Sequence, residues 1–264
     1  MYLRKVSLYA MFFALLLLIA CGGNKQESEE TAAPSKPAAA AKPAGGNAYD
    51  ASKGTATITG KISYDGAPPT LAKLQMNADP YCMSVHKDAV LEQSVEVNAD
   101  KTLKDVLVYV KTGAEKWTFA PPTDPVLLDQ QGCMYSPHVI VLMQNQPLKI
   151  LNSDPTLHNI HPQPTKNTEF NQGMPTKGME ITKVFPNDEI FPVKCDVHRW
   201  MNAHICVMKN PFYAVTGADG SFTIKVPAGT YTLEAWQEKL GTQSASVTVA
   251  DGGSQTANFT FKAM

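Results

Sequence analysis

Four residues of this chain have side chains that could together hold a metal ion. Cys195, His198 and Met201 lie within seven residues of one another, and His158 lies in an earlier segment. A short loop can place the thiolate, the imidazole and the thioether around one ion, and His158 adds a second imidazole. Two imidazoles and a thiolate near one plane, with a weak axial thioether, suit copper in both oxidation states. The ligand types therefore predict one mononuclear, type 1-like copper site.

The segments around these residues resemble the copper-binding segments of cupredoxins. Leu-His-Asn-Ile-His at 157–161 and Cys-x-x-His-x-x-Met at 195–201 carry the resemblance, and the short ligand loop is most similar to that of amicyanin. The resemblance implies that His158, Cys195 and His198 are equatorial ligands and that Met201 is the axial one. It also implies that Asn159 braces the ligand loops by hydrogen bonds, and that His198 is partly exposed and passes electrons to a partner.

Other interpretations of the same residues remain open. A lone Cys-x-x-His loop also occurs in zinc sites and in loops that bind nothing. A disulfide between Cys195 and Cys206 would abolish the copper site. The loop also departs from the cupredoxin pattern at Asp196, where Ser or Thr is common, and it contains Arg199 and Trp200.

The other cysteines have different surroundings. Cys82 and Cys133 both lie in loop-like segments and are predicted to form a disulfide, whose long loop would stabilise the fold by about 4 kcal/mol. Cys206 alternates with apolar neighbours on a predicted strand and is expected to be a buried free thiol.

Three histidines have no part in the resemblance. His86 and His204 have no assigned role. His138 directly precedes a predicted strand. Three roles remain open for it: a position near the copper site, a ligand of a second metal site, or a purely structural residue.

The N-terminal segment has the features of an export signal. Arg4 and Lys5 precede an apolar run that is short for a membrane span and ends in small residues. Residues 18–21, Leu-Ile-Ala-Cys, resemble the bacterial lipobox, which implies a signal peptide over 1–20 and lipid attachment at Cys21. Gly22 behind this cysteine resembles outer-membrane sorting, so we expect an exported protein anchored in the cell envelope, at the outer membrane facing the periplasm. An ordinary signal peptide with a chance cysteine is the alternative.

Residues 21–53 are predicted to be a disordered tether. Their Gly, Ala, Pro, Ser, Lys and Glu side chains cannot bury enough apolar surface to offset the entropy of ordering.

The rest of the chain is predicted to be all-β. Short alternating or β-branched runs recur between turn signals at 55–63, 94–97, 106–111, 139–143, 148–151, 205–208, 221–226, 230–236, 245–249 and 256–261. The Asp-Gly turn at 219–220 and the Pro-Ala-Gly-Thr-Tyr run at 227–231 resemble the carboxypeptidase-regulatory, transthyretin-like β-sandwich. We predict that sandwich over 54–118 plus 211–264, with a cupredoxin-like Greek-key β-sandwich inserted in it or packed with it over 119–210. A single enlarged sandwich is the alternative.

These features favour an electron carrier over a catalyst. The chain has 23 basic and 24 acidic residues, a balance that gives no reason to expect nucleic acid as a partner. One copper centre with a full ligand set has no open position for a small organic substrate. We therefore expect a one-electron carrier with a redox donor and acceptor. The alternatives are a copper-handling or storage lipoprotein and a non-redox interaction subunit of an envelope complex.

Overall fold

The described part of the chain covers residues 47–263 of a computed structural model. The predicted signal peptide, Cys21 and most of the predicted tether lie outside these residues. Within residues 47–263, no helix has both the length and the apolar character needed to cross a membrane.

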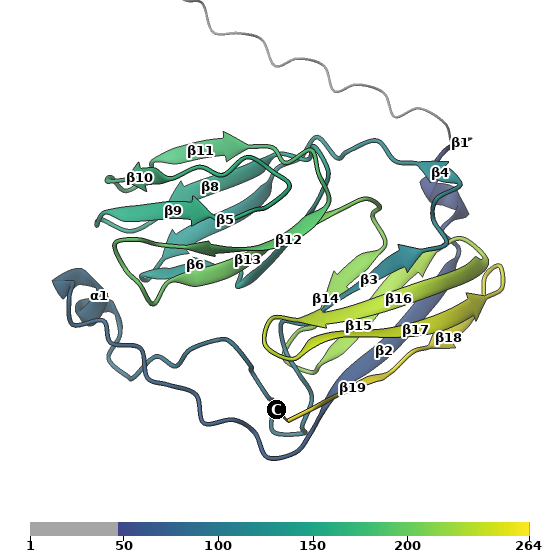
Figure 1. Ribbon diagram of the computed structural model, residues 1–264, viewed down its shortest axis with the longest axis horizontal. Helices are drawn as coiled ribbons and strands as arrows, with labels where there is room; N and C mark the ends of the chain where they lie inside the picture. The colour runs from purple at the N-terminus through teal and green to yellow at the C-terminus, as the bar shows by residue number, and fades with distance from the viewer. Residues whose placement is uncertain (1–46, 264) are drawn as a thin grey trace, which may run out of the picture. The chain divides into compact units, whose positions relative to one another are not determined.

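Strands dominate the described residues, and the predicted all-β class with packed β-sandwiches is confirmed (Figure 1). One sandwich is built from two separate stretches of chain, and we call it the split sandwich. Its sheets follow the orders β14-β3-β16-β17 and β15-β2-β18, with β19 also paired to β2. The strands are β2 (Ala56–Asp65), β3 (Leu107–Thr112), β14 (Tyr213–Val215), β15 (Ser221–Val226), β16 (Gly229–Gln237), β17 (Gly241–Val249), β18 (Ser254–Thr256) and β19 (Phe259–Lys262).

The long strand β2 shows why these residues form a sandwich. Along Ala56–Asp65 every second residue is buried, so one face packs on the core and the other faces outward. Gly60 lies on the buried face, where an added Cβ would come within 1.9 Å of the Ala257 carbonyl oxygen. The absence of a side chain therefore lets the link between β18 and β19 lie close against β2.

The second sandwich lies in the chain between β4 (Trp117–Thr118) and β14, and we call it the inserted sandwich. Its sheets follow the orders β10-β9-β12-β13-β7 and β11-β8-β5-β6. The strands are β5 (Val126–Gln131), β6 (Met134–Ser136), β7 (Val139–Met143), β8 (Leu148–Asn152), β9 (His158–Pro162), β10 (Gln172–Met174), β11 (Glu180–Lys183), β12 (Glu189–Lys194) and β13 (Asn202–Met208). It has its own apolar core, separate from that of the split sandwich.

Strand β13 is buried on both faces because it serves two cores. Ile205 and Val207 pack in the core of the inserted sandwich. Cys206 and Met208 point the other way and pack with Leu107 of β3 in a third apolar cluster. The two sandwiches therefore share a packed junction along β13.

The structure corrects the predicted end of the tether. Residues 47–53 have defined structure: β1 (Asn47–Ala48) pairs with β4 (Trp117–Thr118), and η1 (Ala51–Lys53) follows. The Tyr49 ring lies 5.1 Å from the Phe119 ring and 5.2 Å from the Phe212 ring. Tyr49 therefore anchors the segment to the aromatic cluster. Most other residues of the segment are small or polar, so its composition alone predicted disorder.

Two further details of the long segment between β2 and β3 were predicted wrongly. The strand expected at 94–97 is absent, and only an isolated bridge joins Val97 to Leu103. A short helix, α1 (Pro80–Val85), was not predicted, since six residues are too few to show helical periodicity. Asp79 caps it, accepting hydrogen bonds from the Tyr81 and Cys82 amides.

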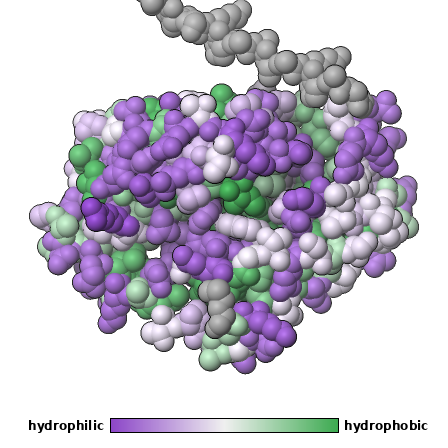
Figure 2. All heavy atoms as spheres, in the orientation of Figure 1, coloured by the Kyte–Doolittle hydropathy of each residue, from purple (hydrophilic) through white to green (hydrophobic). Residues whose placement is uncertain are grey.

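The face drawn in Figure 2 is mostly hydrophilic, and its hydrophobic residues gather in small groups. Most apolar side chains of the sandwiches face the cores instead.

Candidate metal centre

The predicted metal ligands come together at one end of the inserted sandwich. His158 is the first residue of β9, which pairs with β12. Strand β12 ends at Lys194, and the loop from Cys195 to Met201 leads into β13. Two hydrogen bonds close this loop, from the Cys195 amide to the Met201 carbonyl (3.1 Å) and from the Met201 amide to the His198 carbonyl (2.8 Å).

Three ligand atoms converge inside the protein. The Nδ1 atoms of His158 and His198 are 3.0 Å apart. Both lie within 4.8 Å of the Cys195 sulfur, which makes the three residues a possible ligand group. His158 is fully buried, and His198 and Cys195 are 2% and 1% exposed.

The Nε2 atom of each imidazole, which faces away from the other ring, is hydrogen-bonded to a carboxylate. The Nε2 of His158 donates to Asp154 (2.8 Å), and the Nε2 of His198 donates to Asp79 (3.1 Å). These bonds fix the tautomer that leaves both Nδ1 lone pairs free for a metal ion. Sequence analysis missed both carboxylates, although Asp154 lies four residues before a predicted ligand and Asp79 precedes the Pro-Tyr-Cys segment.

Asp154 is itself held by several donors. Its oxygens accept hydrogen bonds from the Tyr81 hydroxyl (2.9 Å) and from the amides of Gly132 (2.8 Å) and Cys133 (2.7 Å). Burial alone would raise the pKa of Asp154, but the hydrogen bonds from His158 and from these groups lower it to about 2. The carboxylate is therefore ionised at neutral pH despite its burial.

The two imidazoles also act on the Cys195 thiol. Burial would raise the pKa of Cys195, but the neighbouring His158 and His198 side chains lower it to about 6. The His198 amide also lies 3.2 Å from the sulfur. A thiolate is the form of cysteine that binds metals.

The two remaining predicted residues lie beside this group. Met201 is fully buried in the same apolar core as Cys195. The side-chain oxygen of Asn159 accepts a hydrogen bond from the Asp196 amide (3.0 Å), which joins β9 to the ligand loop. Its amide nitrogen donates to Asn171.

The expected exposure of His198 is wrong. Its ring lies against that of Trp200, with centroids 4.9 Å apart and a tilt of 40°, and its Nε2 is 3.8 Å from the Cys82 sulfur. Helix α1 carries both Cys82 and, at its N-cap, Asp79. The segment between β2 and β3, which sequence analysis treated as part of another sandwich, therefore covers the imidazole.

A disulfide holds helix α1 over the His198 imidazole. Cys82 of α1 is bonded to Cys133 in the turn between β5 and β6, and the Trp200 indole donates to the Cys133 carbonyl (3.0 Å). Cys195 and Cys206 are unpaired, and Cys206 lies in the junction cluster rather than beside Cys195. Burial raises the pKa of the Cys206 thiol, so it stays protonated.

His161 and His86 make contacts outside the ligand group. His161 bridges Asp196 (2.8 Å) and Glu169 (2.7 Å) near the surface. His86 Nε2 lies 2.6 Å from the Gly132 carbonyl oxygen.

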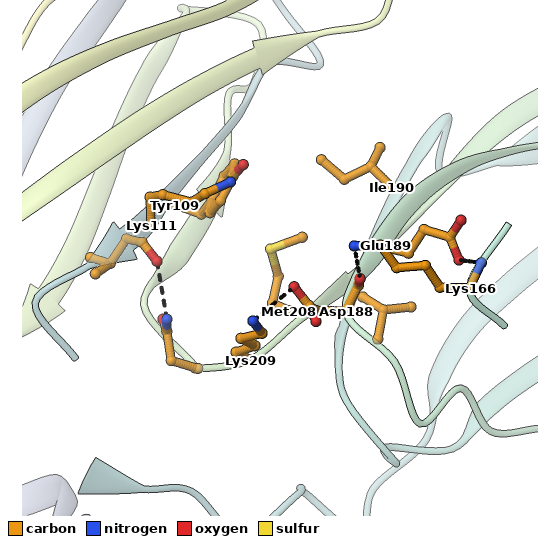
Figure 3. Close-up of a pocket in the computed structure, with 11 residues that line it drawn as sticks. Tyr109, Lys111, Lys166, Asp188, Glu189, Ile190, Met208 and Lys209 are labelled. Carbon is orange, nitrogen blue, oxygen red and sulfur yellow. Dashed lines mark hydrogen bonds and ion pairs between the residues drawn. The ribbon is translucent and has the colours of Figure 1, made fainter. Parts of the chain in front are cut away.

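A pocket of about 270 Å³ lies apart from the metal ligands, with its walls drawn from both sandwiches (Figure 3). Its charged side chains have partners within the chain: Lys209 pairs with Asp188 at 3.3 Å, and Glu189 accepts from the amides of Lys166 and Asn167. No charged group there is left to select a ligand, so the pocket is a crevice at the junction.

The ligand group fits copper by its chemistry. With both Nε2 atoms donating to carboxylates, two Nδ1 lone pairs face each other at 3.0 Å beside a sulfur that favours the thiolate form. Such an arrangement needs a positive charge, either a proton or a metal ion, to be stable. Two imidazoles, one thiolate and a buried thioether in the same core are donors suited to copper.

One part of the chain matches a known protein family. Residues 201–262 match the family model of the carboxypeptidase regulatory-like domain. This match covers β13 and the C-terminal strands of the split sandwich. A search of curated proteins finds no match.

Solved structures of copper proteins show a weak similarity. A copper-containing nitrite reductase from Thermus scotoductus is 19% identical, over 39% of this chain and 25% of that one, with a TM-score of 0.32. A copper(I) form of an amicyanin variant is 14% identical, over 38% of this chain and 98% of that one, with a TM-score of 0.29. A purple cupredoxin from Nitrosopumilus maritimus is 18% identical, over 32% and 98%, with a TM-score of 0.28. These scores are low, so the function proposed below is built on this chain's own residues.

The depressed pKa of Asp154 leads to a pH prediction for the metal-free protein. An acid whose pKa is lower in the folded state than its ordinary 3.8 stabilises the fold above that value, and the stabilisation disappears as the pH falls towards 2. The shift corresponds to about 2 kcal/mol. Urea unfolding should show Asp154→Asn less stable than wild type at pH 5, with the difference shrinking between pH 4 and pH 2.

The exposed Asp124 provides a matched control. Asp124→Asn should change neither the stability at pH 5 nor its dependence on pH. A deficit in Asp154→Asn that stays constant down to pH 2 would contradict the role given to the carboxylate.

Proposed function

We propose that this chain is a copper-binding protein of cupredoxin type that carries single electrons in the cell envelope. One observation carries the proposal: the His158, His198 and Cys195 donor atoms converge in a buried space, and a carboxylate orients each imidazole. Copper, when bound, would supply one-electron exchange between its two oxidation states. His158, Cys195 and His198 would hold it, with Met201 as a weak fourth ligand.

Rigidity supports a carrier over a storage protein. A carboxylate hydrogen-bonds the outer nitrogen of each imidazole, and two backbone hydrogen bonds close the ligand loop. A disulfide holds α1 over His198. A site that moves little between oxidation states suits electron transfer, whereas release of copper requires the ligands to open. The same full ligand set favours a carrier over an enzyme, since it leaves no position for a substrate.

Burial of His198 changes the expected path for electrons. Trp200 is a partly exposed side chain whose ring lies against this imidazole. It therefore offers the partner protein a surface near the metal ligands. The donor and acceptor would be redox proteins that dock over this loop.

The copper site is tested by loading the full-length protein with Cu(II). An intense visible charge-transfer band from the Cys195 thiolate to copper is expected, because that sulfur is the thiolate of the ligand group. Cys195→Ser and His158→Ala should lose the band. Cys206→Ala is the matched control and should retain it, since Cys206 is a buried thiol of the junction. Equal spectra for Cys195→Ser and wild type would refute copper binding at this site.

Voltammetry tests the redox role, with copper-loaded wild type expected to give a reversible couple. The negative charge of Asp79 behind His198 favours Cu(II). Asp79→Asn removes this charge but keeps a side chain that can cap the helix. The reduction potential should rise, by about 59 mV for a tenfold change in preference. Asp124→Asn should leave it unchanged. Copper loss on reduction would instead support a storage or handling role.

We also propose that lipid at Cys21 anchors the protein to the outer membrane, on the side facing the periplasm. The lipobox-like residues before Cys21 and Gly22 after it support this. In cell fractionation, wild type should appear in the membrane fraction and Cys21→Ser should be soluble. Wild type in the soluble fraction would contradict the anchor.

A further inference from the structure

A second group of metal-binding side chains lies at the junction between the sandwiches. It contains His138, just before β7, His204 on β13, and Glu238, just after β16. His204 lies on the face of β13 that carries Cys206, and its ring lies 5.1 Å from that of Trp236. Two ligands therefore come from the inserted sandwich and one from the split sandwich.

The backbone brings the two imidazoles together. Strands β7 and β13 run parallel, and the His204 amide donates to the His138 carbonyl at 2.8 Å. The two rings are 6.2 Å apart between centroids. Glu238 is placed by the turn after β16, where the neighbouring Gln237 side chain accepts from the Lys239 and Leu240 amides.

The ligand atoms are close but are not hydrogen-bonded to one another. Glu238 Oε2 lies 2.8 Å from His204 Nδ1 and 3.4 Å from His138 Nε2, and one atom from each residue fits within 4.8 Å of the others. Even so, His204 Nδ1 and both ring nitrogens of His138 have no hydrogen-bond partner of acceptable geometry in the described residues.

Polar atoms without hydrogen-bond partners are unusual in side chains as buried as these. The His138 side chain is 3% exposed, that of Glu238 is 7% and that of His204 is 17%. Buried polar atoms without partners are costly, and each calls for an explanation such as an ion. A cation between the two imidazoles and the carboxylate would satisfy these unpartnered atoms.

The charges nearby also favour a cation. The Glu238 carboxylate lies 2.8 Å from His204 Nδ1 and 3.4 Å from His138 Nε2. Asp105 adds a second carboxylate near His138, and Lys104 pairs with both Asp105 (3.3 Å) and Glu96 (3.0 Å). These three carboxylates outnumber the ammonium group of Lys104.

We propose that His138, His204 and Glu238 form a second metal site, for a divalent transition-metal ion such as Zn(II), that joins the inserted and split sandwiches. Two imidazoles and one carboxylate are a zinc ligand set, with the fourth position left to water or another small ligand. The absence of a thiolate makes this site harder in character than the one at Cys195, so the two sites would select different ions. A bound ion would link the sandwiches without a covalent bond.

The test counts zinc ions bound to the full-length protein by equilibrium dialysis and elemental analysis. Zinc can also bind at Cys195, so the readout is the difference between wild type and Glu238→Gln. That variant should bind one equivalent fewer, or bind it at least tenfold more weakly. Glu234→Gln is the matched control, because Glu234 lies on β16, just before Glu238 in the chain, and pairs with Lys111 instead. It should bind as much zinc as wild type.

His204→Gln provides a second variant in case Glu238→Gln fails to fold, and circular dichroism checks each fold. Wild-type zinc stoichiometry and affinity in a folded Glu238→Gln or His204→Gln variant would overturn the proposal. So would zinc located elsewhere by anomalous diffraction.

The second site is independent of the copper proposal. Failure of copper binding at Cys195 would appear in the Cys195→Ser comparison and would leave the Glu238-dependent zinc equivalent in place.

Discussion

The candidate metal centre depends on two imidazole–carboxylate hydrogen bonds. Asp154 and Asp79 hold the outer nitrogens of His158 and His198, so the inner nitrogens face each other beside Cys195. Much of the neighbouring structure serves these two contacts. The turn between β5 and β6 donates two amides to Asp154, and the N-terminus of α1 fixes Asp79. The candidate ligand arrangement is thereby positioned by hydrogen bonds from residues around it.

The sequence alone predicts the ligands of this site but not the carboxylates that orient them. The ligand types and spacing at 195–201 predict a site because consecutive loop residues must be neighbours in space. The partners at Asp79 and Asp154 were missed because their roles depend on tertiary contacts: Asp79 lies 119 positions from His198. The exposure of His198 was wrong for the same reason, since the segment that covers it belongs to a distant part of the chain.

At the level of the fold, periodicity was informative where a strand buries one face. β2 and β16 alternate cleanly and were predicted close to their observed ends. β9 was not predicted, because burial on both faces removes the alternation. β12 was missed although its burial alternates, since Pro192 within it argues against a strand. The helix α1 and the ordered residues 47–53 depend on a cap, a disulfide and one tyrosine, which leave little trace in local patterns.

The Cys82–Cys133 bond has a consequence for the order in which the protein matures. Disulfides persist in oxidising compartments and are rare where thiols are kept reduced. The helix over His198 is therefore secured only once these two thiols have been oxidised, whereas the loop from Cys195 to Met201 needs no oxidation to form. For the proposed copper site, oxidation of these thiols before metal delivery would secure the helix over His198 before the ion arrives.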